Sequence, residues 1–256
     1  MAYQQHEPIA AFRSVIDAYW INRARVGDAA PFDRVLPDGC IDLIFRGGAA
    51  GGRLFAGALI ERPMFVSGGE TAWFVGVRFR PAMARALLDI DPVDCRDREI
   101  PAAAIAGSLA ALEARLQDCA SSHDALGILR RAVDERLAQG ERRLAPQRVC
   151  EAIDRLARGA EIQRVARMLG MAERTLHRDL VCWSGLAPKS LARILRMQRC
   201  LAALRAGRAP LALVALRLGY ADQAHMTREL KELTGFRPSE IAAASRRPVR
   251  NLQDAA

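Results

Sequence analysis

Short apolar runs separated by breaks rich in glycine and proline occupy residues 34–80. The runs include CIDLIF, RLFAGALI and TAWFVGVRF. Runs of four to eight residues rich in Val, Ile and Phe between Gly and Pro are typical of β-strands. Several such runs in succession predict a small β-barrel or a β-sandwich.

Beyond Pro81 the apolar positions change to a helical spacing. Two sets recur at steps of three and four: Leu109, Leu112, Leu116 and Cys119, then Leu126, Leu129, Val133 and Leu137. They predict two amphipathic helices, antiparallel because their connection is short. We expect their apolar faces to pack on the strands of the same chain, with packing on a second copy as the alternative. The charged segment 141–146 is the predicted linker.

A pattern of helix, glycine turn and helix then occurs twice. The copies read EIQRVARMLGMAERTLHRDLVCWSG and PLALVALRLGYADQAHMTRELKELTG, with the turns at Gly170 and Gly219. This is the layout of a helix-turn-helix, whose second helix enters the major groove of DNA. The segment 190–206 between them predicts a helix of about 25 Å. Such a connector would hold the two reading helices near one turn of the duplex apart, about 34 Å.

The charge of the chain is split between its two halves. The whole chain has a formal net charge of +9. Residues 1–141 hold 16 basic and 19 acidic side chains, whereas residues 142–256 hold 22 basic and 10 acidic ones, a net of +12. An excess of this size attracts polyanions, and arginine, which supplies 20 of the 22 cations, can grip a phosphate or a guanine edge. A solvated cationic surface is the alternative explanation.

The second half of the chain resembles a known family. Residues 146–245 resemble the DNA-binding domain of AraC-type transcriptional regulators, most specifically in LGYADQAHMTRELKELTGFRPSE. The segments PDGCIDLIF and VGVRFRPAM resemble a domain found ahead of such domains. The resemblance implies a first domain that senses a small molecule or dimerises, and a second that binds promoter DNA. Ala172 and Ala224 stand where polar residues are common in the family, so fewer DNA contacts are expected there.

These observations predict an α+β protein of two domains. Residues 1–141 would form a β-rich barrel or sandwich-like domain with a helical hairpin, and residues 142–256 an all-α domain with two helix-turn-helix units. The predicted function is that of a sequence-specific transcriptional regulator that binds double-stranded promoter DNA and responds to a small-molecule effector. RNA polymerase and a second copy of the chain are further candidate partners. An enzyme with a DNA-targeting tail and a non-specific nucleic-acid-binding protein are the alternatives.

The residues predicted to contact DNA lie on the second helix of each unit. On the first reading helix they share a face by their steps of three and four. The full set is Arg174, His177, Arg178, Gln223, His225, Thr227 and Arg228. Arg178 and Arg228 occupy equivalent places, and we expect at least one to read a guanine and Gln223 to read an adenine or a neighbouring pair. Contacts to phosphate or surface ion pairs are the alternatives, and Arg193, Arg196 and Arg199 of the connector are predicted to face solvent or phosphate.

Aromatic residues concentrated on the predicted strands suggest an effector pocket. Arg78 and Arg80 alternate around Phe79, so we expect both on one face, where they would hold an anionic effector together with Trp73 and Phe45. A solvated sheet face is the alternative. Cys40, at a predicted turn, is either an oxidant-sensing thiol or a buried small residue.

The sequence offers little for catalysis or metal binding. None of the four histidines lies within residues 34–80, and the six cysteines are too scattered for a zinc site. Asp38 and Asp42 are better explained as a turn cap and a strand-edge carboxylate than as an acid–base pair. We expect no catalytic residues, no metal and no cofactor. With no predicted signal peptide or membrane-spanning segment, a cytoplasmic protein is expected.

Overall fold

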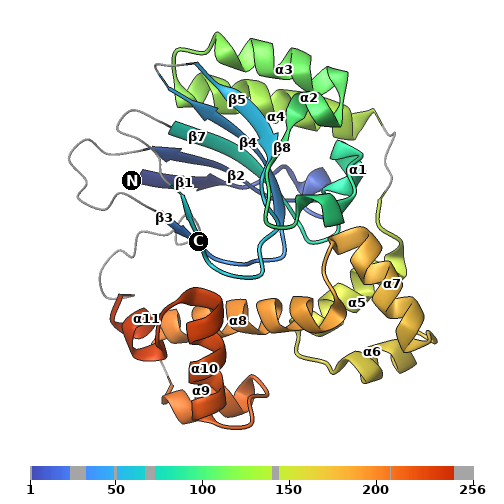
Figure 1. Ribbon diagram of the computed structural model, residues 1–256, viewed down its shortest axis with the longest axis vertical. Coiled ribbons are helices and arrows are strands. Elements are labelled where there is room, and N and C mark those ends of the chain that lie inside the picture. The colour runs from blue at the N-terminus through green and yellow to red at the C-terminus, as the bar shows by residue number, and fades with distance from the viewer. Residues whose placement is uncertain are drawn as a thin grey trace.

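The computed structural model describes residues 2–23, 33–48, 51–66, 73–139, 144–207 and 209–244. A sheet-rich region, residues 2–139, comes first, and a helical region, residues 144–244, lies below it (Figure 1). The predicted order of a β-rich part followed by a helical part is confirmed. The predicted boundary at 141 falls in residues 140–143, outside the described residues, and remains a prediction.

An open antiparallel sheet forms the body of the first region. In spatial order its strands are β1 (Ala2–His6), β2 (Ile16–Arg23), β7 (Trp73–Phe79), β4 (Ile41–Gly47), β5 (Arg53–Ala56) and β8 (Ile100–Pro101). A separate two-stranded ribbon pairs β3 (Asp33–Val35) with β6 (Met64–Val66). The arrangement is sandwich-like and not a closed barrel. Strands β1 and β2 lie ahead of the segment in which the sequence predicted strands.

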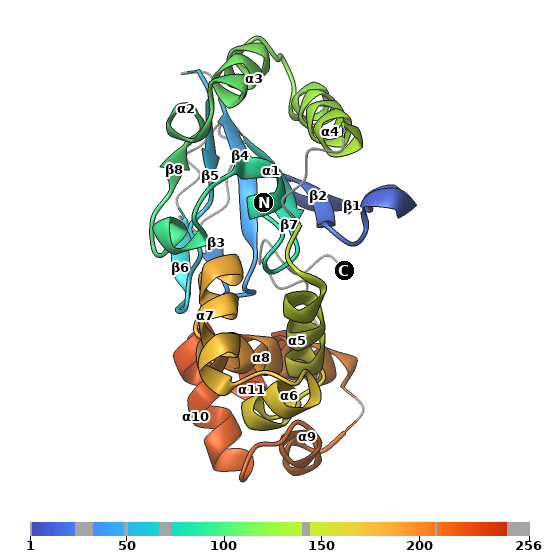
Figure 2. The ribbon, with the colours of Figure 1, turned by 90° about the vertical axis from the view of Figure 1, so that its right-hand side faces the viewer.

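One face of the sheet carries the main core. Successive side chains of a strand point to opposite faces, so Leu43 and Phe45 of β4 share a face with Val75 and Val77 of β7. This face is covered by α3 (Gly107–Gln117) and α4 (Ser122–Ala138). Figure 2 shows both helices on the same side of the sheet. The predicted helical hairpin and its packing within the chain are confirmed.

Short elements connect the strands to the helical hairpin. They are η1 (Ala10–Phe12), α1 (Arg85–Leu88), η2 (Pro92–Cys95) and α2 (Ala102–Ile105). Among them, η2 packs against α7 (Glu173–Ser184) of the helical region. The sheet-rich region therefore contacts the helical region through this connecting segment, and also through Arg34 of β3, which donates to the Thr234 carbonyl.

The helical region consists of two small bundles joined by one long helix. The first bundle contains α5 (Gln147–Ala157), α6 (Ile162–Met168) and α7 (Glu173–Ser184), and the second contains α9 (Leu211–Arg217), α10 (Gln223–Thr234) and α11 (Pro238–Ala244). Helix α8 (Pro188–Ala206) runs between them (Figure 1). With 19 residues it is about 28 Å long. No helix among the described residues is long and apolar enough to span a bilayer.

Helices α7 and α10 end in the same way. Gly185 and Gly235 follow them in the left-handed conformation, with φ of 75° and 76°, which glycine adopts without strain. In each case a hydroxyl just before the glycine donates to a carbonyl one turn back: Ser184 to Leu180 and Thr234 to Leu230, both at 2.7 Å. The two predicted repeats are therefore repeats in three dimensions.

Candidate DNA-binding surface and ligand pocket

Helix α7 buries one face and exposes the other. Leu176 and Leu180 are completely buried. Arg174, His177 and Arg178, one and two positions away, are exposed. The three predicted residues therefore share the solvent face, as their spacing indicated.

Helix α10 begins with a side-chain cap. The carboxylate of Asp222 accepts a hydrogen bond of 2.6 Å from the backbone N–H of His225. Gln223 and Arg228 are exposed on the first turns of the helix. Since α7 follows Ala172, which has no capping side chain, the two reading helices start differently.

Two of the residues predicted to contact DNA on α10 interact with neighbouring residues of the chain, either in the helix or in the turn before it. The His225 ring accepts from the backbone N–H of Ala221 at 3.3 Å and packs edge-on against Tyr220, with centroids 5.4 Å apart. The Thr227 hydroxyl donates to the Gln223 carbonyl at 2.9 Å. Both are half-buried, so Gln223 and Arg228 are the more accessible groups on this helix.

A buried carboxylate ties each reading helix to a neighbour. The Asp179 carboxylate of α7 accepts a hydrogen bond of 2.9 Å from Arg148 of α5. The Glu229 carboxylate of α10 accepts hydrogen bonds of 2.7 Å from Arg196 and 3.2 Å from Arg193, both on α8. Asp179 and Glu229 directly follow Arg178 and Arg228, so the same position in both repeats holds the acid.

This contact corrects the prediction for the connector arginines. Arg193 and Arg196 do not simply face solvent, because the acid that holds them comes from α10, more than thirty residues away. The Arg199 guanidinium lies against Gly159. A hollow of about 940 Å³ lies between α8 and the two bundles and is lined by His225 and Arg228 as well as Lys189.

The two reading helices lie at opposite ends of α8 but on one side of it. Figure 1 separates α7 and α10 along the connector, and Figure 2 shows both on the same side. The two reading helices therefore form two separate projections from the helical region. Their separation follows from the length of α8.

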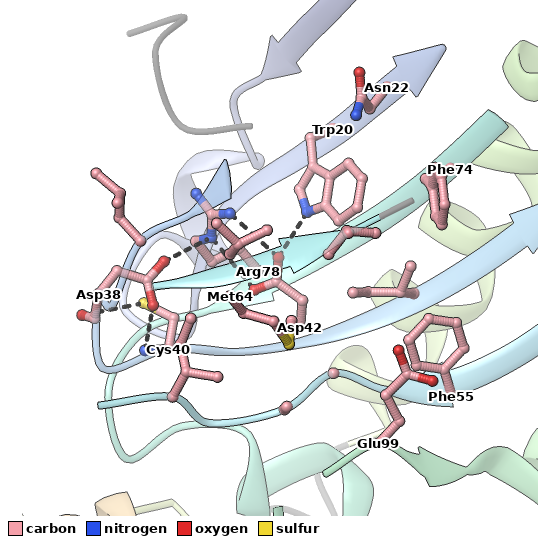
Figure 3. Close-up of a pocket in the computed structure, with 17 residues that line it drawn as sticks. Trp20, Asn22, Asp38, Cys40, Asp42, Phe55, Met64, Phe74, Arg78 and Glu99 are labelled. Atoms are coloured by element: carbon pink, nitrogen blue, oxygen red, sulfur yellow. Dashed lines mark hydrogen bonds and ion pairs between the residues drawn. The ribbon is translucent and has the colours of Figure 1, made fainter. Parts of the chain in front are cut away.

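The other face of the sheet forms the floor of a pocket (Figure 3). Trp20 of β2, Asp42 of β4 and Arg78 of β7 project from it side by side. The Trp20 indole N–H donates to Asp42 at 2.9 Å. Gly76 allows this, because a Cβ there would lie 2.4 Å from the indole.

Arg78 is shared by two carboxylates. Its guanidinium lies 3.3 Å from Asp38 and 3.3 Å from Asp42, and only 10% of its side chain is exposed. Asp38 also caps the turn by accepting 2.8 Å from the Cys40 backbone N–H, as predicted. Asp42, predicted at a strand edge, instead lies in an interior strand of the sheet.

Apolar side chains close the pocket around these charges. The ribbon of β3 and β6 covers the floor, and the cavity has a volume of about 90 Å³. Its apolar lining comes from six strands and the connecting loops: Trp20, Val35, Leu36, Ile44, Phe55, Ile60, Met64, Val66 and Phe74. A lining that is mainly apolar and aromatic, with a few charged groups, is typical of small-molecule sites.

The structure separates the four residues predicted to bind an effector. Arg78 lines the pocket, but Arg80 follows the end of β7 and lies exposed, 4.0 Å from Asp17. Trp73 and Phe45 pack together, with centroids 5.6 Å apart, and line a different hollow of about 220 Å³ beside α3. Arg78 is thus the one member of the predicted set in this pocket.

Burial changes the acidity of two groups in the pocket. It raises the pKa of Asp42 to about 6, against the opposing effect of Arg78. Burial, assisted by Asp38, also raises the pKa of the Cys40 thiol well above its ordinary value. A thiol that stays protonated is a poor nucleophile, which favours the buried small residue over the sensing thiol. Within the described residues no group of three His, Cys, Asp or Glu side chains converges on a metal site.

Two arginines of the sheet-rich region donate hydrogen bonds to the C-terminal ends of the reading helices. Arg96 donates to the Gly185 carbonyl at 2.6 Å, and Arg34 donates to the Thr234 carbonyl at 3.0 Å. The Arg34 guanidinium also lies 3.9 Å above the Phe236 ring. These two contacts were not predicted, because nothing in the local sequence pairs residues 89 and 200 positions apart.

One segment belongs to both the pocket and this interface. Val35, Leu36, Asp38 and Cys40 line the pocket. The same stretch contacts the helical region. Leu36 packs in the core of the second bundle, and the Pro37 carbonyl accepts a hydrogen bond of 2.6 Å from the Gln198 side chain of α8. We call residues 34–40 the shared segment.

Comparison with known families matches two parts of the chain. Residues 165–244 match a helix-turn-helix domain, HTH_18. Residues 4–101 match a domain of unknown function, DUF6597. No curated protein matches the chain.

Three solved structures illustrate what this chain is similar to. An AraC-type regulator from Chromobacterium violaceum is 19% identical over 40% of this chain and 96% of its own, with a TM-score of 0.38. The DNA-binding domain of AdpA, solved with a target DNA, is 22% identical over 41% of this chain and 96% of its own, with a TM-score of 0.36. ToxT from Vibrio cholerae O395 is 11% identical over 96% of this chain and 99% of its own, with a TM-score of 0.44.

Proposed function

Residues 165–244 form a helix-turn-helix domain of the AraC type, and on that premise we propose that the chain is a sequence-specific transcriptional regulator that responds to a small molecule. The observation that carries the proposal is the pair of exposed, arginine-bearing faces on α7 and α10. In each helix a buried carboxylate, Asp179 or Glu229, pairs with an arginine of a neighbouring helix, and both helices lie on the same side of α8.

In this proposal α7 and α10 enter successive major grooves of one DNA duplex. Arg178 and Arg228 each reach a base edge or a phosphate, and Gln223 adds a contact from the start of α10. A connector of about 28 Å is shorter than one helical turn of DNA, about 34 Å, so bending of the duplex toward the protein would complete the fit.

The response to a small molecule would pass through the shared segment. A ligand in the pocket contacts Val35 and Leu36, and the adjoining Arg34 holds the end of α10. A displacement of Val35 and Leu36 would therefore also move Arg34 and alter its contact with the end of α10. RNA polymerase and a second copy of the chain remain predicted partners.

Selection of bound sequences from a random pool of duplex oligonucleotides tests the DNA-binding function. The purified full chain should enrich a motif with two half-sites about one turn apart. Arg178→Ala and Arg228→Ala should each weaken binding to that motif by about 1–3 kcal/mol where a base is contacted, or about 5- to 150-fold.

A matched substitution separates base contact from loss of charge. Arg131, an exposed arginine of α4 in the sheet-rich region, should be replaceable by Ala without loss of the motif. Equal affinity for random and enriched DNA would contradict the proposal and favour non-specific binding. Binding should also weaken steeply with rising salt.

A further inference from the structure

We propose that the pocket takes a cationic ligand, a small apolar molecule that carries an ammonium or amidinium group. This inference rests on the proposed function only in treating the pocket as the effector site. It replaces the anionic effector expected from the sequence. Three features of the site support it: the balance of charges, the length of the ion pairs, and the aromatic floor.

The charged groups that line the cavity do not balance. Among the described residues that line the cavity, Asp38, Asp42 and Glu99 supply three carboxylates, and Arg78 supplies one cation. Arg53 pairs with Glu99 from outside the lining residues. The floor itself therefore keeps two carboxylates for one guanidinium, and an anion placed there would meet a site already rich in negative charge.

The ion pairs on the floor are long. Arg78 lies 3.3 Å from Asp38 and makes two contacts of 3.3 Å with Asp42. Charge-assisted hydrogen bonds between nitrogen and a carboxylate oxygen are typically about 2.7–2.9 Å. One guanidinium is thus shared between two carboxylates at a distance longer than that of a strong charge-assisted hydrogen bond, and in the proposal the ligand adds a second cation to them.

The rest of the lining selects the body of the ligand. Trp20 and Phe74 lie on the floor, and Phe55 of β5 also lines the cavity (Figure 3). Aromatic faces attract cations, and the aliphatic wall of Val35, Leu36 and other apolar residues favours a hydrocarbon body. A cavity of about 90 Å³ limits that body to about the size of a single ring or a short chain.

Proton binding at Asp42 gives the site a pH dependence. The groups around its carboxyl are Arg78 of β7, Asp38 and Cys40 of the shared segment, Trp20 of β2, and Tyr3 of β1. Because burial raises the pKa of Asp42 to about 6, the carboxyl is largely protonated at pH 5 and largely ionised above pH 7. A cation binds the ionised form, so its affinity should rise between pH 5 and 7 and level off above.

Three probes with one ring and different heads test the assignment. Benzylamine, benzyl alcohol and benzoate are titrated into the full chain by calorimetry, with the melting temperature as a second readout. We expect benzylamine to bind at least about tenfold more tightly than benzyl alcohol, and benzoate to bind most weakly. Tighter binding of benzoate or of the alcohol, or binding of none of the three, would overturn the assignment.

Variants locate the cation within the cavity. Asp42→Asn and Asp38→Asn each remove one carboxylate of the floor, whereas Asp118→Asn removes an exposed carboxylate outside the pocket. Loss of the preference for the amine in Asp42→Asn or Asp38→Asn, with Asp118→Asn unchanged, supports the proposal. If Asp42→Asn fails to fold, Asp38→Asn and the pH profile of the natural chain decide. A preference retained in every folded variant and at pH 5 would refute it.

The outcome is separable from that of the DNA-binding proposal. Selection of DNA is carried out without the amines, and the titrations are carried out without DNA. Amine binding in a chain that enriches no motif would leave the ligand class standing and the regulator proposal rejected. An enriched motif in a chain that prefers benzoate would give the reverse result.

Discussion

The two helix-turn-helix repeats have the same backbone arrangement but differ in the residues that stabilise it. In both, a hydroxyl and a glycine end the reading helix, and an arginine of the sheet-rich region donates to a carbonyl at that end. The C-terminus of a helix carries partial negative charge and unpaired carbonyls, which makes it a natural anchor for a guanidinium. The same type of contact, an arginine bonded to a C-terminal carbonyl, therefore occurs in both repeats.

The arginines that grip these ends have different neighbours. Arg96 grips the first repeat, and the residues on either side of it do not line the pocket. Arg34 grips the second, and the two residues after it, Val35 and Leu36, form part of the pocket wall. The difference suggests an anchored first repeat and a second repeat whose support depends on what fills the pocket.

The buried acids behind the reading helices should show the largest difference between the repeats. Glu229→Ala leaves Arg193 and Arg196, which are 30% and 24% exposed, without their shared carboxylate, and should lower the free energy of unfolding by about 3 kcal/mol. Asp179→Ala should cost only about 1 kcal/mol, because its partners Arg148 and Arg178 are 54% and 75% exposed and water can replace the carboxylate. Urea unfolding followed by circular dichroism measures both, and equal costs would contradict the comparison.

The glycines that end the reading helices should differ by a smaller amount. Replacing either by Ala strains a backbone with positive φ by about 1–2 kcal/mol. At Gly185 the new Cβ would also lie 2.8 Å from the Pro92 carbonyl oxygen, which is backbone, whereas at Gly235 it would meet the end of the Arg34 side chain. We therefore expect Gly185→Ala to destabilise the chain more than Gly235→Ala.

Gly219 provides the control for the second of these substitutions. It has the same φ of 76° as Gly235, and a Cβ there would contact nothing within 4 Å. The difference in unfolding free energy between Gly235→Ala and Gly219→Ala therefore isolates the contact with Arg34. If Gly235→Ala proved costlier than Gly185→Ala, the Arg34 contact would be the more rigid of the two.

The sequence predicted the parts of this comparison that depend on local periodicity. The spacing of Leu176 and Leu180 gives the buried face of α7, and the glycines give the helix ends. It could not predict β2 as part of the pocket floor, because this strand is buried on both faces and Trp20 lies in a nearly continuous apolar run without alternation. It placed Arg80 beside Arg78 because nothing local marks the end of β7 at Phe79.

Contacts between distant segments were beyond any local pattern. Arg193 and Arg196 look like ordinary exposed arginines on an amphipathic helix until Glu229 is placed beside them. The grip of Arg34 on Thr234 spans 200 positions, and only the fold brings the two together. The charge imbalance of the pocket likewise appears only when Asp38, Asp42 and Arg78 are seen to share one floor.

The two gripping arginines should show the smallest effect on stability and the sharpest effect on regulation. Arg34→Ala and Arg96→Ala each remove one hydrogen bond to a carbonyl, worth about 1 kcal/mol. If the pocket acts on the second repeat, Arg34→Ala should abolish the change in DNA affinity that a bound ligand causes in the natural chain, whereas Arg96→Ala should retain it. Titration of the enriched duplex with and without benzylamine measures this, and footprinting should show altered protection only at the half-site of α10. If both variants lost the response to the ligand equally, the sheet-rich region would act on the two repeats as one rigid body. The contact of Arg34 would then have no special role in transmitting the effect of the pocket.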